Sequence, residues 1–181
     1  MNLDGAILLW IQENLRTPVL NAILSVITHL GDSGIIWIIL AVILLCFKKT
    51  RKVGVCTSLA LLTTLFANEL LLKHLIHRAR PIETIEGLTT VVATPNSGSF
   101  PSGHSASSFA SVFVLLMLVP KKYSIPTLVF GTVIALSRLY VGVHYPTDVL
   151  AGILMGISYG FVGWRLGTFL YNRKRFKNVA S

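Results

Sequence analysis

The sequence predicts an all-α integral-membrane protein, a helical bundle with six transmembrane helices. Two observations indicate this class. The 181-residue chain is 53% hydrophobic and 13% charged, with a mean hydropathy of +0.71, whereas soluble domains carry about 25% charged residues. The apolar residues are also gathered into runs that glycine, proline and basic residues separate. A water-soluble fold of this length cannot hide so much apolar surface, so we expect lipid around the helices.

The elements follow in order along the chain. Residues 1–17 are expected to form an interfacial helix, because polar side chains interrupt its apolar residues; a longer first span is the alternative. A basic tail is expected over 171–181, and the whole chain, 1–181, is expected to be one domain. A helix needs about 20 apolar residues to cross a bilayer, so the span boundaries within 18–170 are approximate: 18–31, 34–47, 53–75, 104–119, 125–142 and 147–170.

The net charge of +9 arises largely from basic clusters that directly follow apolar runs, at 48–52, 121–122 and 173–177. Short basic loops at span ends are typical of the cytoplasmic side, and they can also contact anionic lipid headgroups. The loop 76–103 and the turn 143–146 then lie on the non-cytoplasmic side. No nucleic-acid-binding module is visible. No signal peptide is visible either, which favours a bacterial inner (plasma) membrane.

Three cations fall on the non-cytoplasmic side of the predicted bundle. Lys73 and Arg80 are seven residues apart, about two helical turns, so both can face one way. Arg138 adds another guanidinium, a group that binds phosphate oxygens in pairs. Each cation alone is equally consistent with a surface charge that reaches toward the headgroups. Three that converge would repel one another without an anion, so together they predict an anion site.

Residues 101–104, with the sequence Pro-Ser-Gly-His, are expected to open a helix. Pro101 suits the first helical position because it loses no hydrogen bond there. Ser102, Gly103 and His104 would then lie in the first turn, where free N–H groups and the helix dipole attract an anion. A plain turn that enters a span is the structural alternative.

His144 and Asp148 are four residues apart, and Pro146 indicates that a helix begins between them. Asp148 can accept a hydrogen bond from one ring nitrogen of His144 and leave the other free to attack phosphorus; stabilising the helix start is its alternative role. His104 can then protonate the leaving oxygen and later activate water. These three side chains could instead bind a metal. The surrounding cations oppose a divalent ion, so we expect no metal and no cofactor.

These segments resemble the signature of the type 2 phosphatidic acid phosphatase (PAP2) family. Its pattern is K-x6-R-P, then P-S-G-H, then S-R-x5-H-x3-D, and every fixed position is matched in order over 73–148. The resemblance implies a metal-independent lipid phosphatase in which His144 becomes a phosphohistidine, Asp148 orients it and His104 is the general acid. It also implies a phosphate cradle composed of Lys73, Arg80, Ser102, Gly103 and Arg138.

The motifs recognise phosphate and say little about the lipid tail. The expected external site favours undecaprenyl pyrophosphate, hydrolysed to undecaprenyl phosphate, over phosphatidylglycerol phosphate or phosphatidic acid. A lipid-phosphate or anion transporter that does not hydrolyse its ligand is the alternative of another class, although no repeated pair of broken helices is visible. We also expect Glu69 to pair with Lys73 one turn away and glycines 152, 156, 160 and 163 to allow close helix packing.

Overall fold

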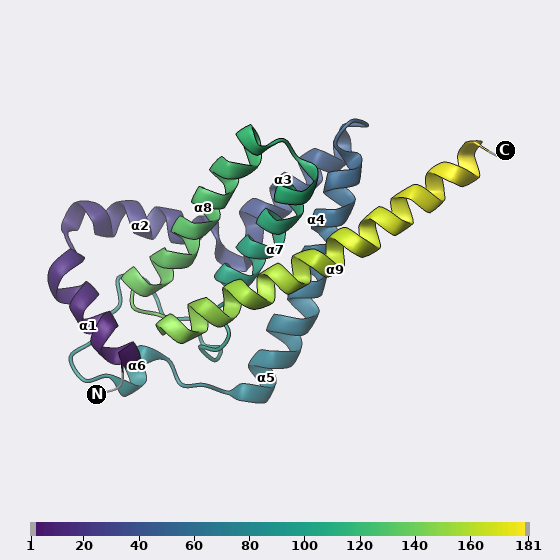
Figure 1. Ribbon diagram of the computed structural model, residues 1–181. Coiled ribbons are helices and arrows are strands. Elements are labelled where there is room, and N and C mark those ends of the chain that lie inside the picture. The colour runs from purple at the N-terminus through teal and green to yellow at the C-terminus, as the bar shows by residue number, and fades with distance from the viewer. Residues whose placement is uncertain (1–2, 180–181) are drawn as a thin grey trace.

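The computed structural model describes residues 3–179, with side chains through Arg173, and these residues form helices without strands. The all-α class is confirmed, and a helix occurs over each of the six expected segments (Figure 1). In order, the elements are α1 (Leu3–Leu15), α2 (Pro18–Leu30), the 3₁₀ turn η1 (Asp32–Gly34), α3 (Ile35–Cys46), α4 (Arg51–Thr64), the π-helical η2 (Leu65–Leu72), α5 (Lys73–Ile76), α6 (Pro81–Thr84), α7 (Gly103–Leu118), α8 (Lys121–Tyr140) and α9 (Pro146–Val179).

Helix length supports fewer membrane crossings than the expected six. Within the described residues, Arg51–Thr84 and Pro146–Arg173 are long and apolar enough to cross a membrane, and α2 with η1–α3, bent by 45°, adds a third if that pair is one span. The bend is where Ser33 and Gly34 take positive φ angles of 52° and 69°. Helix α7 has 16 residues, or about 24 Å at 1.5 Å per residue, against a hydrocarbon core of about 30 Å. The number of spans stays a prediction.

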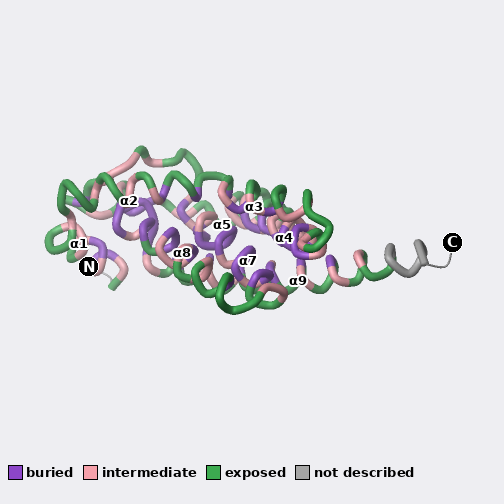
Figure 2. Tube along the Cα trace, turned by 90° about the horizontal axis from the view of Figure 1, so that it is seen from above, coloured by how far each residue is buried: buried purple, intermediate pink, exposed green. Residues whose placement is uncertain are grey.

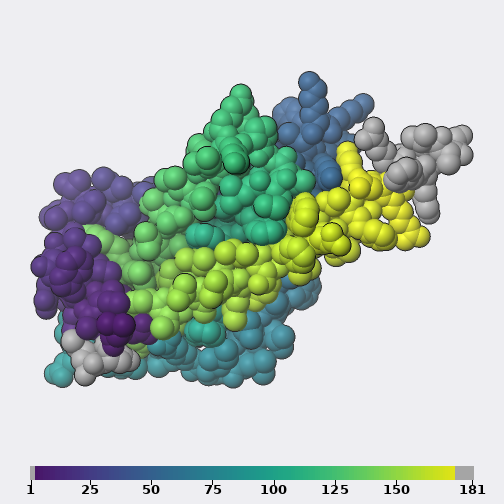
Figure 3. All heavy atoms as spheres, in the orientation of Figure 1, coloured from purple at the N-terminus to yellow at the C-terminus, as the bar shows by residue number. Residues whose placement is uncertain are grey.

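Helix α9 crosses the face of the molecule and packs on both α7 and α4 (Figure 3). Glycines form its contact surface: a Cβ at Gly152 would lie 2.6 Å from the Ser102 carbonyl oxygen in front of α7, and one at Gly163 would lie 2.6 Å from the Ala60 Cα on α4. Only hydrogen at these positions lets the backbones approach so closely. The close packing predicted from the glycine spacing is therefore confirmed.

Buried residues lie along the middle of the bundle, while much of the outside is exposed (Figure 2). The core combines small and large side chains from α3, α4, α7 and α8, among them Trp37, Ala60, Val112 and Ile134. Many large apolar side chains are exposed instead, including Val19, Leu70, Val129, Leu154 and Phe169. Such a surface suits lipid contact and is unusual for a monomeric soluble protein.

The two ends of the bundle carry different residues. The α3–α4 and α7–α8 connections, which adjoin basic clusters, lie at the upper end in Figure 1. The start of α7, the end of α8 and the start of α9 converge at the lower end. There the Ser102 N–H donates to the Asp148 carbonyl at 3.1 Å, which ties the start of α7 to the start of α9. The motif residues are thus gathered at the end opposite the basic loops.

Candidate functional site

A cavity of about 940 Å³ lies beside these converging helix ends. Six residues that the sequence assigns to phosphate chemistry line it, although they come from three motifs that lie apart in the chain: Lys73, Arg80, Gly103, His104, Arg138 and His144. Ser102 and Asp148 lie behind this wall, and both are fully buried. The fold therefore brings together residues that stand more than 70 positions apart.

Two guanidinium groups are held firmly at the wall of the cavity. Arg80, 2% exposed, donates from Nε to the Ser97 carbonyl at 2.9 Å and from Nη1 to the Val143 carbonyl at 2.8 Å. Arg138 donates from Nη1 to Thr28 Oγ1 at 2.6 Å, but its Nε is buried without a hydrogen-bond partner. An unpaired donor in a buried guanidinium is costly, and an anion in the cavity would satisfy it.

Lys73 and Arg80 reach the cavity by a route that differs from the expected one. The helix ends at Ile76, and His77 takes a left-handed conformation with φ 43°. Arg80 lies beyond that reversal, so the two cations do not share one helical face. The expected ion pair between Lys73 and Glu69 is confirmed, with Nζ 2.7 Å from Oε2. Glu69 Oε1 also lies against the α carbon of Gly103, where a side chain would collide with it.

The start of α7 differs from the expectation in one detail. Pro101 lies outside the helix, Ser102 is the N-cap and Gly103 is the first helical residue. The Ser102 hydroxyl oxygen accepts the Ser105 N–H at 3.4 Å and the Ser105 hydroxyl at 3.0 Å, so this side chain caps the helix. The prediction that Gly103 and His104 lie in the first turn is confirmed.

His144 sits in the turn before α9, which begins at Pro146 as predicted. Its Nδ1 lies 3.5 Å from Asp148 Oδ2, longer than a good hydrogen bond but close enough for a charge to act on the ring. His144 is 2% exposed. Burial, together with the nearby Arg138, Arg80 and Lys73, lowers the pKa of His144 well below its ordinary value. The imidazole is therefore neutral at pH 7, the form in which a ring nitrogen can attack.

The other motif histidine, His104, has a carboxylate partner as well. Its Nε2 lies 3.0 Å from Asp32 Oδ1 and 3.1 Å from the Thr28 carbonyl oxygen. Asp32 belongs to η1, the break between α2 and α3, and its side chain is 53% exposed. The site thus holds two histidine–aspartate pairs at a cation-rich cavity.

Comparison with known proteins agrees with this geometry. Residues 51–171 match the PAP2 superfamily. The chain belongs to this superfamily. Among curated proteins, it is 30% identical to the undecaprenyl-diphosphatase of Sulfolobus acidocaldarius over 147 residues, which cover 81% of this chain and 70% of that one.

Two solved structures share the fold. Aquifex aeolicus LpxE superposes with a TM-score of 0.75 at 26% identity, covering 91% of this chain and 96% of that one. The PAP2-type phosphatidylglycerolphosphate phosphatase of Bacillus subtilis gives 0.71 at 31% identity, covering 88% and 82%. The chain is a PAP2 lipid phosphatase of the membrane. The relatives' names cover different lipids, so family membership leaves the substrate open.

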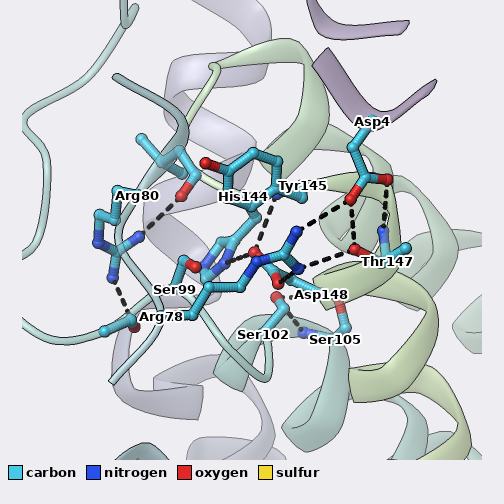
Figure 4. A network of polar contacts seen from close by, with 12 residues as sticks. Asp4, Arg78, Arg80, Ser99, Ser102, Ser105, His144, Tyr145, Thr147 and Asp148 are labelled. Atoms are coloured by element: carbon cyan, nitrogen blue, oxygen red, sulfur yellow. Dashed lines mark hydrogen bonds and ion pairs between the residues drawn. The ribbon is translucent and has the colours of Figure 1, made fainter. Parts of the chain in front are cut away.

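Three charged residues of this PAP2 protein enter the site without having been assigned to it from the sequence: Asp4, Asp32 and Arg78. Arg78 donates to Asp148 Oδ1 at 2.5 Å and to Asp4 Oδ2 at 3.0 Å (Figure 4). A signal existed for Arg78, which stands two residues before Arg80 inside the first motif. Asp4 and Asp32 are single acids beside apolar runs, and their spacing does not point to the motifs.

Proposed function

We propose that this PAP2 phosphatase hydrolyses a lipid phosphomonoester or diphosphate through a phosphohistidine on His144. One observation carries the proposal: the buried imidazole of His144 lies in a cavity wall with Lys73, Arg80 and Arg138, and the Asp148 carboxylate lies 3.5 Å from its Nδ1. Asp148 favours the tautomer with the proton on Nδ1, which leaves Nε2 as the nucleophile.

The reaction proceeds in two steps, formation of the phosphohistidine and its hydrolysis. Nε2 of His144 attacks phosphorus, the bond between phosphorus and the leaving oxygen breaks, and His104 gives that oxygen a proton. Water then attacks the phosphohistidine while His104 takes its proton, and the nitrogen–phosphorus bond breaks to release phosphate. The three cations and the Gly103 amide stabilise the charged oxygens in both transition states. Ser102 supports them by capping the helix that presents Gly103.

The chemistry proposed for this site is metal-independent. Three cations at the cavity oppose a divalent ion but suit a phosphate. Among residues 3–173, no group of three or more His, Cys, Asp or Glu side chains is placed to hold a metal. Phosphate release by the purified protein in detergent should therefore persist in excess chelator, whereas chelator-sensitive turnover would reject this part of the proposal.

The cavity also supports a lipid substrate. Away from the cations, much of its lining is apolar and comes from α3, α4 and the start of η2, with Ile38, Val42, Leu61, Leu62 and Leu65. A tail can lie there while its phosphate reaches His144. The basic clusters at the other end of the bundle favour a site on the non-cytoplasmic side of the membrane. We propose that this membrane is a bacterial inner membrane and that the chain forms a single domain with six spans.

For that location we propose undecaprenyl pyrophosphate as the substrate, with phosphatidylglycerol phosphate or phosphatidic acid as the second candidate. The test is a panel of lipid phosphates that differ only in tail or headgroup. Wild type, His144→Ala and His74→Ala are each assayed on the panel. His74→Ala is the control, because His74 is exposed and does not line the cavity. Turnover of glycerolipid phosphates alone would reject undecaprenyl pyrophosphate. Binding without phosphate release by any variant would select the transporter alternative.

A further inference from the structure

Arg78 joins two carboxylates that are 144 positions apart in the chain, Asp4 and Asp148. Its Nη1 donates to Asp148 Oδ1 at 2.5 Å and its Nη2 to Asp4 Oδ2 at 3.0 Å (Figure 4). The same Nη1 donates to Thr147 Oγ1 at 2.8 Å, and the guanidinium carbon stacks 3.9 Å from the centre of the Tyr145 ring. These contacts hold the planar fork in one orientation.

Arg78 contributes to both the charge and the position of Asp148. The carboxylate is 0% exposed, so water does not stabilise it. Oδ2 accepts the Tyr145 N–H at 3.0 Å, and Oδ1 accepts from Arg78. Removing one partner of a buried ion pair leaves an uncompensated charge. With Oδ1 held by Arg78, Oδ2 is the oxygen directed at His144 Nδ1.

Asp4 holds the other side of this network. Its Oδ1 accepts the Thr147 N–H at 3.3 Å and its Oδ2 accepts the Thr147 hydroxyl at 2.5 Å, so it caps the first turn of α9 from outside. Asp4 lies in the first turn of α1, a helix that carries none of the PAP2 motif residues. Through Arg78, α1 is therefore connected to the residue behind the nucleophile.

We propose that Arg78 is a positioning residue for the His144–Asp148 pair, and that Asp4 makes α1 part of this apparatus. The inference rests on the proposed function and deepens it. Arg78 is not among the cavity-lining residues, so it acts through Asp148 and does not bind the substrate phosphate. Loss of Arg78 should therefore lower kcat and leave KM unchanged.

The test is a double-mutant cycle on the full-length protein in detergent, with phosphate release as the assay. Arg78→Gln should lower kcat about 10- to 100-fold, the effect of losing a charge-assisted hydrogen bond, and Arg78→Lys should restore part of it. In an Asp148→Asn background, Arg78→Gln should cost nothing further, because its effect passes through that carboxylate. Asp4→Asn should lower kcat by less than about tenfold, again without effect in Asp148→Asn.

The control is Arg51→Gln, because Arg51 lies at the other end of the bundle, where its Nε donates to the Leu45 carbonyl at 3.1 Å. This variant should have the kcat and KM of wild type. A raised KM with unchanged kcat in Arg78→Gln, or a full additional loss in Asp148→Asn, would overturn the proposal. If Arg78→Gln does not fold, Asp4→Asn in both backgrounds carries the same test.

His144→Ala distinguishes failure of the proposed function from failure of this inference. If His144→Ala keeps activity, the proposed function is wrong. If His144→Ala is inactive while Arg78→Gln matches wild type, only the inference about Arg78 is wrong.

Discussion

The two histidine–aspartate pairs of the site are built in opposite ways. Asp148, behind His144, is 0% exposed and is held by Arg78 and by a backbone N–H. Asp32, beside His104, is 53% exposed, and its carboxylate pairs with His104 at 3.0 Å. One carboxylate is fixed in the protein interior, and the other lines the cavity and is open to solvent.

This difference corresponds to the two proposed roles. A nucleophile must meet phosphorus at one distance and angle, so its partner gains from a rigid setting. A general acid first faces the leaving oxygen and then a water molecule, and its partner can remain at a solvated edge. An exposed pair contributes little because water screens it, whereas a buried pair is costly to break. Substitutions at the two pairs should therefore differ in size and in kind.

The largest difference is expected between the two histidines themselves. His144→Ala should abolish turnover of every substrate, a loss of about 10⁴-fold or more, because no covalent intermediate forms. His104→Ala should cost about 10²- to 10⁴-fold on a lipid phosphate but far less on an aryl phosphate, whose leaving oxygen needs no proton. Phosphate release from both substrates by both variants is the measurement. Equal losses for His104→Ala on the two substrates would contradict its role as an acid.

A smaller but diagnostic contrast is expected between the two aspartates. Asp148→Asn should lower kcat by about 10²- to 10⁴-fold, because the amide does not stabilise the developing charge on His144. Asp32→Asn should cost no more than about fivefold, the scale of an exposed pair. Steady-state kinetics on one lipid substrate compares the two. Equal losses would show that burial does not distinguish the pairs.

The smallest effect concerns stability in acid. The lowered pKa of His144 means that the folded protein keeps this ring neutral, while the unfolded chain binds a proton below about pH 6.5. Stability should therefore fall as pH drops below that value, by at most about 1.4 kcal/mol per pH unit for this one group. His144→Asn should reduce the slope of Tm against pH between 7.5 and 5. An unchanged slope would mean that the ring is protonated in the fold.

Much of this protein could be predicted from local sequence. The apolar runs indicate each main helix, Pro146 marks the start of α9, and the glycine spacing of α9 indicates its close contacts. The cation and histidine motifs identify six cavity-lining residues. Other predictions depended on details that the patterns leave open. Pro101 precedes α7 instead of opening it, because Ser102 takes the capping position, and Lys73 and Arg80 are separated by the reversal at His77.

The amino-acid sequence by itself determined which groups are available for phosphate chemistry and which helices carry them, because helical period and turn preference act over a few residues. Only the tertiary structure decided which carboxylate meets which partner: Asp32 with His104, and Asp4 through Arg78 with Asp148. Those pairs are 70 or more positions apart, and helix crossings bring them together. The spacing of residues along the chain does not predict which helices cross.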